Sequence, residues 1–221
     1  MTRHEEKQHI EAGTQLAQES ETGSRTLSGK IGVFIRWFAI AMSLFQLYTG
    51  FFGELPGYKQ LSVHLAFAMV LCYVYFPLSK KSPRHRMTLP DAILAVLAGA
   101  AAIYVFANYE HWVNAQGDAP VYDIVTGGIL LAFILEATRR SVSPMLPVIT
   151  LIFLCYAYFG PYIPGELAHR GFRVARIIDH IFMSGEGLWS IPLRVSSTFV
   201  FLFVLFGALR LTCRNHRRAA Q

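Results

Sequence analysis

The chain has few charged residues. Asp, Glu, Lys and Arg make up 15% of its 221 residues, whereas an average soluble domain carries about 25%. Because charged side chains cover the wet surface of a soluble protein, this shortage argues against a soluble domain. Hydrophobic residues make up 53% of the chain and lie in long blocks instead of at amphipathic spacing. The composition therefore indicates an integral membrane protein.

Cysteine is also scarce. Cys72, Cys155 and Cys213 lie far apart and none belongs to a Cys-x-x-Cys pair, so neither a disulfide framework nor a cysteine metal site is implied. No Gly-x-x-x-x-Gly-Lys loop occurs, which disfavours an ATP-driven pump. The net charge of +6 comes from short basic clusters between apolar runs. Such clusters set membrane orientation, so we expect no nucleic-acid partner.

The apolar runs predict an all-α integral membrane protein with about six transmembrane helices plus one interfacial amphipathic helix. The amphipathic helix is expected at Phe172 to Met183, because its apolar residues recur at i, i+3, i+4 and i+7 and its Arg and His residues occupy the opposite face. The expected spans are about Arg36 to Gly53, Leu61 to Leu78, Leu89 to Asn108, Val121 to Leu135, Met145 to Tyr162 and Ile191 to Leu209.

The interiors of these spans contain few groups that could do chemistry. His64 is their only strongly titratable residue, and a haem site would need a second histidine on a facing helix. We therefore expect His64 to be a hydrogen-bonded core residue, and Gln46, Tyr48 and Thr49 to bond to neighbouring helices. A membrane enzyme would need paired Asp residues, a Ser–His pair or a metal cluster at matching depth. An enzyme is therefore the weakest of the functions considered, and no catalytic, cofactor or metal site is predicted.

Two features of the spans predict helix contacts. Ala95, Ala98, Gly99 and Ala102 recur at three- and four-residue spacing, which lets a neighbouring helix approach closely. Glu136 precedes Arg139 and Arg140 by three and four residues, the favourable order for helical ion pairs. This motif fits either a salt-bridged helix end or a contact point for another helix or domain.

The basic residues predict the orientation. With six spans and the N-terminus inside, all but five of the 20 Lys and Arg residues lie on the inner side. We therefore expect both termini in the cytoplasm. The five outside residues are Lys59, Arg170, Arg173, Arg176 and Arg194.

Several motifs together resemble a known family, the membrane component of tripartite ATP-independent periplasmic (TRAP) transporters. The resemblance is to fused permeases of the type paired with TAXI binding proteins, and it covers about Gly29 to Gly207. The motifs are Glu136-Ala137-Thr138-Arg139-Arg140, Tyr156 with Phe159-Gly160-Pro161-Tyr162-Ile163-Pro164-Gly165, His169-Arg170-Gly171-Phe172, Glu186-Gly187, Ile191-Pro192-Leu193 and the run Thr198 to Gly207.

The resemblance implies a multi-pass protein of the bacterial inner membrane that works with a periplasmic solute-binding protein and with the remaining transport-domain helices. It divides the chain into a disordered cytoplasmic tail (1–30), a four-helix region like the small subunit (31–140), the start of a region like the large subunit (141–209) and a basic cytoplasmic tail (210–221). The motif positions expected to have a structural or contact role are Glu136, Arg139, Arg140, Gly160, Pro161, Pro164, His169, Arg170, Gly171, Glu186 and Pro192.

The chain also departs from the family. In the family, the last run continues into many more helices, including re-entrant hairpins that hold sodium and the organic acid. Here the run after Gly207 gives way to a basic segment. The expectation is therefore a scaffold portion of an ion-driven secondary transporter, with the sodium and substrate sites elsewhere. The alternative is a truncated or frameshifted gene remnant without independent transport.

Overall fold

The structure is a computed structural model that describes residues 25, 27, 29–78, 87–115 and 118–219. Within these ranges the regular structure is entirely helical, so the predicted all-α fold is confirmed. The elements are α2 (Gly29–Phe52), α3 (Lys59–Tyr75), α4 (Leu89–Ala107), α5 (Tyr109–Asn114), α6 (Val121–Ser141), α7 (Met145–Phe159), a 3₁₀ turn (Gly160–Tyr162), α8 (Val174–Met183), α9 (Ile191–Val195), a π-helical turn (Ser196–Val200) and α10 (Phe201–Ala219).

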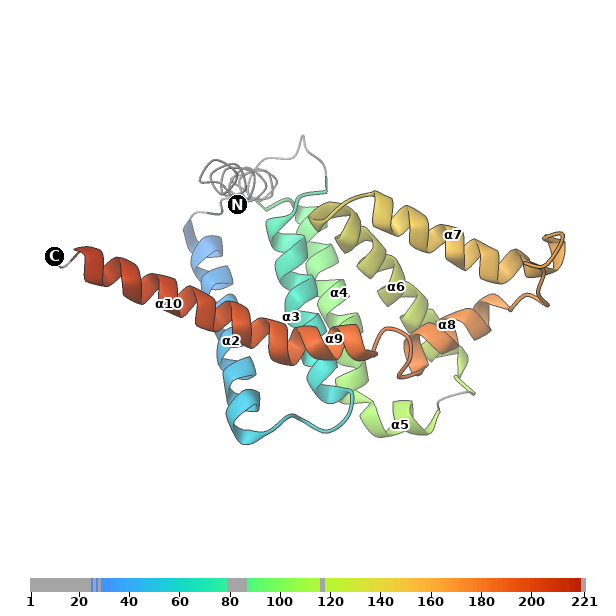
Figure 1. Cartoon of the computed structure of the whole chain (residues 1–221), viewed down its shortest axis with the longest axis horizontal. Coiled ribbons are helices and arrows are strands. Elements are labelled where there is room, and N and C mark those ends of the chain that lie inside the picture. Colours follow the sequence, from blue (N-terminus) through green and yellow to red (C-terminus); the bar gives the residue numbers. More distant parts are fainter. Residues whose placement is uncertain (1–24, 26, 28, 79–86, 116–117, 220–221) are drawn as a thin grey trace, which may run out of the picture.

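Helices α2, α3, α4 and α6 run side by side as a bundle (Figure 1). The closest packing is between α3 and α4, where the small residues of α4 face its neighbour. Ala95, Ala98 and Ala102 are buried, and a Cβ added at Gly99 would lie 2.8 Å from a methyl carbon of Val70. The prediction that these small residues allow a close helix approach is confirmed.

Helices α7 and α8 form a hairpin beside the bundle, and α8 returns to pack on α6 (Figure 1). Gly127 and Gly128 of α6 provide the contact. A Cβ at Gly127 would lie 2.6 Å from the ring of Phe182, and one at Gly128 would lie 3.4 Å from Ile178. The predicted amphipathic pattern of α8 holds in part. Arg173, Arg176 and His180 are exposed and Ile177, Ile178 and Ile181 are half-buried, but Val174, the first residue of the predicted apolar face, is 56% exposed. That α8 lies in the membrane interface stays a prediction.

The last helical segment runs from Ile191 to Ala219 and contains the π-helical turn. It crosses α2 and α3 in Figure 1 instead of running alongside them, and Leu202 lies near Gly50 of α2. The sequence predicts a basic tail after Leu209, but the backbone stays helical to Ala219. Arg, Leu and Ala favour helix, so the change from apolar to basic residues does not end the helix.

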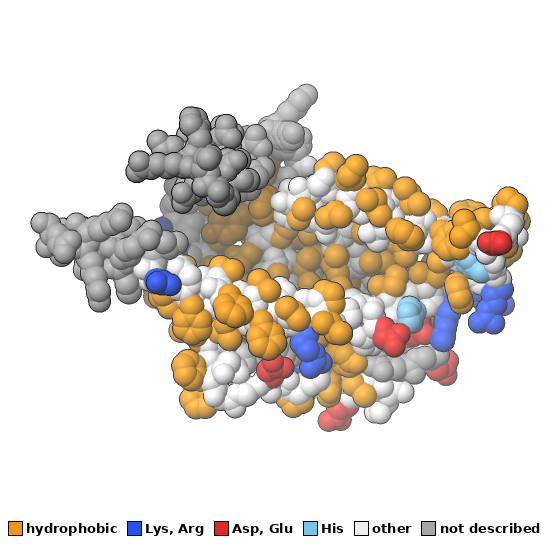
Figure 2. Space-filling model, in the orientation of Figure 1, with side chains coloured by type: hydrophobic (Ala, Val, Ile, Leu, Met, Phe, Trp, Pro, Cys, Tyr) orange, Lys and Arg blue, Asp and Glu red, His pale blue; other side chains and the backbone are white. Residues whose placement is uncertain are grey.

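Five helices are long and apolar enough to cross a membrane, and α3 is a shorter apolar helix of 17 residues. The spanning segments are Ile31–Phe52, Leu89–Ala107, Val121–Ser141, Met145–Tyr162 and Ile191–Arg210. Figure 2 shows hydrophobic side chains over the outside of the molecule, including the surfaces of α7 and α10. The chain is therefore a multi-pass membrane protein by the length and composition of its helices.

The beginning of the fold differs from the sequence prediction. Helix α2 starts at Gly29, seven residues before the expected start at Arg36. Arg25, which the sequence assigned to a disordered tail, is buried, and its backbone N–H donates to the carbonyl of Tyr75 over 2.8 Å. The other tail residues, 1–24, 26 and 28, lie outside the described residues.

Candidate functional site

A group of charged side chains lies at the end of the bundle where α4 begins and α6 ends. We call Arg25, Asp91, Glu136, Arg139 and Arg140 the ion cluster. The carboxylate of Asp91 accepts from Arg25 Nη2 at 2.5 Å and from Arg140 Nη1 at 2.8 Å, and all three side chains are fully buried. The hydroxyl of Thr88 also donates to Asp91 over 2.5 Å. Asp91 therefore pairs with two buried guanidinium groups, and Arg140 has Glu136 as a second carboxylate partner.

Glu136 binds both arginines of its own helix. Its carboxylate accepts from Arg139 Nε and from Arg140 Nε, each at 2.7 Å. The predicted i+3 and i+4 ion pairs are therefore present. The same arginines reach the end of α3: Arg139 donates to the carbonyl of Leu78 over 3.2 Å, and the guanidinium of Arg140 lies 4.7 Å from the ring centre of Tyr73.

The ion cluster thus ties three helices and the segment before α2 at one end of the bundle. The geometry of Glu136-Ala137-Thr138-Arg139-Arg140 fits both interpretations, because Glu136 pairs with both arginines at the end of α6 and Arg140 also pairs with Asp91 of α4. Arg140 is directed into the protein, whereas the Arg139 side chain is 43% exposed and is the member that a partner could reach. The sequence missed Arg25 and Asp91 as members because their partners lie far along the chain.

A second polar cluster joins α2 to α3 inside the bundle. Gln46 Nε2 lies 2.6 Å from His64 Nδ1, and Gln60 Nε2 donates to Gln46 Oε1 and to the Thr49 hydroxyl, each over 3.1 Å. All four side chains are buried. The predictions that His64 is a hydrogen-bonded core residue and that Gln46 and Thr49 bond to a neighbouring helix are confirmed. The same prediction for Tyr48 is wrong, because Tyr48 is 60% exposed and its ring packs on Phe52 of its own helix. A cavity of about 240 Å³ lies between this cluster and the π-helical turn, lined in part by Gln46, Thr49, Ser197 and Thr198.

A third polar group lies at the opposite end of the bundle from the ion cluster. Asp123, which the sequence did not single out, is fully buried. It accepts from the Tyr104 hydroxyl over 2.6 Å and lies 3.0 Å from His111 Nε2. This arrangement joins α4, α5 and α6. The segment from Tyr109 to Pro120, which connects α4 to α6, contains helix as well as loop, since α5 forms a turn of helix there.

Aromatic rings fill the space between α5, α8 and the turn before α9. We call Tyr58, Trp112, Phe182 and Trp189 the aromatic cluster. Trp112 lies at its centre, with ring centres 4.6 Å from Tyr58, 6.2 Å from Phe182 and 6.0 Å from Trp189. Trp189 is buried, and its Nε1–H donates to the Phe182 carbonyl over 2.6 Å. Burial follows because α8 and the following turn fold back onto α5.

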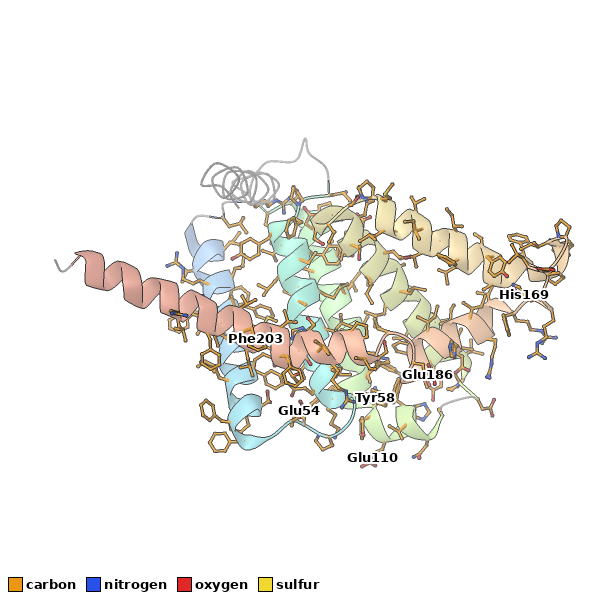
Figure 3. All side chains as sticks on the ribbon, viewed as in Figure 1. Glu54, Tyr58, Glu110, His169, Glu186 and Phe203 are labelled. Carbon is orange, nitrogen blue, oxygen red and sulfur yellow. The ribbon has the colours of Figure 1, made fainter. Side chains whose placement is uncertain are left out.

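Most of the remaining motif residues build the connection between α7 and α8, which we call the α7–α8 loop (160–173). His169 lies at its centre and is labelled in Figure 3. Its Nδ1 accepts from the Gly171 N–H and its Nε2 lies within hydrogen-bonding distance of the Tyr156 carbonyl, both at 3.1 Å. These two contacts fit the tautomer in which Nε2 carries the ring proton.

Two glycines allow the loop to close on itself. A Cβ at Gly160 would overlap the ring of His169, so no side chain fits there. Gly171 has φ of 69°, which favours glycine, and a Cβ there would lie 2.6 Å from Pro161. The motif positions Gly160, Pro161, His169 and Gly171 therefore act together as a structural turn.

An open cleft of about 540 Å³ lies along this loop, and we call it the arginine cleft. Arg170 and Arg173 contribute its cationic groups, and Tyr158, Phe159 and Tyr162 contribute aromatic rings. Both arginines are exposed. The guanidinium carbon of Arg170 lies 5.8 Å from the ring centre of Phe172. Arg170 is the motif residue that brings an exposed positive charge to this loop.

The other predicted motif positions do not join a shared site. Pro164 is exposed in the α7–α8 loop, and Pro192 is in the first turn of α9, a favourable place for proline. Glu186 is exposed, and its backbone N–H donates to the Ser184 hydroxyl over 3.3 Å. In the described part of the chain, no three His, Cys, Asp or Glu side chains are grouped so that they could hold a metal ion.

Comparison with known proteins returns no match: no family model, no curated protein and no solved structure is similar to this chain.

Proposed function

We propose that the chain is a membrane scaffold portion of a TRAP-type secondary transporter for organic acids or similar small solutes. In this proposal a periplasmic binding protein delivers the solute, and an ion gradient acts through transport helices other than those described above. The observation that carries the proposal is the location of the motif residues. Glu136, Arg139 and Arg140 belong to the ion cluster, and Gly160, Pro161, His169 and Gly171 form the turn of the α7–α8 loop, so most motif positions hold helices in place.

The packing supports a rigid role. The ion cluster fixes one end of the bundle, Asp123 with Tyr104 and His111 fixes the other, and the hydrogen bonds of His64 and Gln60 join two helices between them. A buried polar network in which the side chains hold one another favours one arrangement of the helices over others. A scaffold for a moving transport domain needs helices that stay in one arrangement.

The surfaces of α7 and α10 support the proposal that more helices attach. Pro147 is the only buried residue of α7 among those described, and Phe203 and Val204 of α10 are 76% and 66% exposed. Phe203 points away from the bundle in Figure 3. Such surfaces are stable only against lipid or against other transmembrane helices.

We also propose that the bundle end with the ion cluster faces the cytoplasm. Arg25, Arg139 and Arg140 lie at that end, whereas Glu54 and Glu110 lie at the opposite end (Figure 3). An excess of Lys and Arg on cytoplasmic segments is the usual determinant of orientation. The cytoplasmic termini follow from the same argument, whereas the inner-membrane location in this proposal comes from the family resemblance.

Single cysteines should test this orientation in a background without Cys72, Cys155 and Cys213. Asn114, the last residue of α5, lies before α6, and Val142 directly follows α6; both are exposed. In intact cells, Asn114→Cys should react with a membrane-impermeant maleimide and Val142→Cys should react only after the cells are opened. Labelling of Val142→Cys alone in intact cells would reverse the topology.

The scaffold function itself predicts two results with affinity-tagged chain. From its own host the chain should retain a periplasmic solute-binding protein, identified by mass spectrometry, while an unrelated inner-membrane protein with the same tag does not. In liposomes with a sodium gradient and that binding protein, the chain alone should give no organic-acid uptake above empty liposomes, because no broken-helix midplane site is predicted. Failure to retain the binding protein would favour the remnant, and gradient-dependent uptake would contradict the scaffold role.

A further inference from the structure

We propose that the hairpin of α7 and α8 binds an anionic phospholipid, with one acyl chain in an apolar groove against α6 and the phosphate at Arg170 and Arg173. The site requires only that the chain lies in a bilayer, so it does not depend on the transporter proposal. It combines two neighbouring hollows of different chemistry.

The first hollow is an apolar groove of about 340 Å³ between α6, α7 and α8. Its lining comes from Leu131 and Leu135 of α6, Leu151 and Leu154 of α7, and Ile177 and Ile178 of α8, with Gly128 and Ala132 leaving space at its base. No charged side chain lines it. In a bilayer such a groove cannot hold water at low cost, so a hydrocarbon chain is the occupant that its surface favours.

The second hollow is the arginine cleft, which continues from the groove. Tyr158 and Phe159 line both hollows, and Arg173 of the cleft directly precedes Val174 of the groove. A ligand with an apolar tail and a polar head could therefore occupy both. Tyrosine rings are common at the level of lipid headgroups, where one edge is apolar and the other is wet.

The charges of the cleft favour an anionic headgroup. Arg170 and Arg173 are both exposed, and neither forms an ion pair with a described residue. Arg176, the next arginine along the chain, differs because it donates to Asp179 over 3.1 Å. Helix α8 begins at Val174, so its positive end also points toward the cleft. Two guanidinium groups bind a phosphate through charge-assisted hydrogen bonds.

A phospholipid accounts for these features better than a soluble anion does. A free anion would contact the arginines but would leave the adjoining apolar groove unfilled. The groove and the cleft form one amphipathic surface, and the bilayer supplies phospholipids at very high local concentration. The preference for an anionic lipid over a zwitterionic one comes from the two unpaired arginines.

Native mass spectrometry of the purified full chain should test the site. In detergent with equal amounts of palmitoyl-oleoyl phosphatidylglycerol and phosphatidylcholine, the wild-type chain should retain one phosphatidylglycerol preferentially. An arginine beside the headgroup favours the anionic lipid, and two of them correspond to a preference of about thirtyfold. Arg170→Gln with Arg173→Gln should remove most of that preference. Ala132→Trp, which fills the groove, should reduce retention of both lipids.

The matched control removes two other exposed arginines, Arg36 and Arg194, as Arg36→Gln with Arg194→Gln. It has the same net charge as the Arg170 and Arg173 variant and should keep the wild-type preference. Circular dichroism should be unchanged in all variants, since the replaced side chains are exposed. Equal retention of the two lipids by the wild type would overturn the proposal, as would an equal loss in the control. Complete displacement by millimolar glycerol phosphate would also overturn it, because the site would then bind phosphate without the acyl chain.

Discussion

Replacing Asp91 with alanine should lower the melting temperature of the purified protein by about 6–20 °C. The Asp91 carboxylate is the partner of both Arg25 and Arg140, and all three side chains are fully buried. Removing one partner of a buried ion pair costs about 3–5 kcal/mol, because the opposite charge is left without compensation. For a chain of this size each kcal/mol corresponds to about 2–4 °C.

The measurement is thermal unfolding in one detergent, followed by circular dichroism and by loss of the monodisperse peak in size-exclusion chromatography. Asp118→Ala is the matched control, because Asp118 is exposed and such substitutions usually change stability by about 0.5 kcal/mol or less. Asp91→Asn should fall between Asp91→Ala and wild type, since the amide can still accept hydrogen bonds. If Asp91→Ala melts within about 2 °C of wild type, its loss of stability is too small for the ion cluster to hold the bundle together.

Replacing Trp112 with alanine should have an effect of similar size at the other end of the bundle. Trp112 is fully buried and its ring contacts three other aromatic rings that come from separate parts of the chain. Substituting a buried tryptophan with alanine costs about 3–5 kcal/mol, from the lost burial and the cavity that remains. The loss of stability should be largest near α8, in addition to the effect on the whole protein, because Trp112 is the contact between α5 and the segment that holds α8.

Hydrogen–deuterium exchange should separate these two effects. In Trp112→Ala, amides of residues 174–189 should exchange faster than in wild type, whereas those around Asp91 and Arg140 should change little. Trp37→Ala provides the control, since Trp37 is 66% exposed on α2. Uniformly faster exchange over the whole chain would mean that the aromatic cluster has no special role in holding α8.

Local features of the sequence predicted much of the fold. The apolar runs predicted the helices because a helix that crosses a bilayer must be apolar over about 20 residues. The spacing of Ala95, Ala98 and Ala102 predicted the packing of α4, and the order of Glu136, Arg139 and Arg140 predicted their ion pairs. Each of these patterns lies within one helix, where the backbone geometry fixes which side chains are neighbours. The burial and hydrogen bonding of His64 also followed from its place in an apolar run.

The partners of the same residues were decided by tertiary structure. Asp91 and Arg140 are 49 residues apart and Asp91 and Arg25 are 66 apart, so no helical period connects them. The same holds for Trp112 and Trp189, whose contact requires α8 and the following turn to fold back onto α5. The apolar composition of α10 likewise does not predict its oblique path across α2 and α3 (Figure 1). Hydrophobic periodicity specifies which residues leave water, but which helix faces meet depends on the shapes and charges of surfaces that are brought together only when the chain packs.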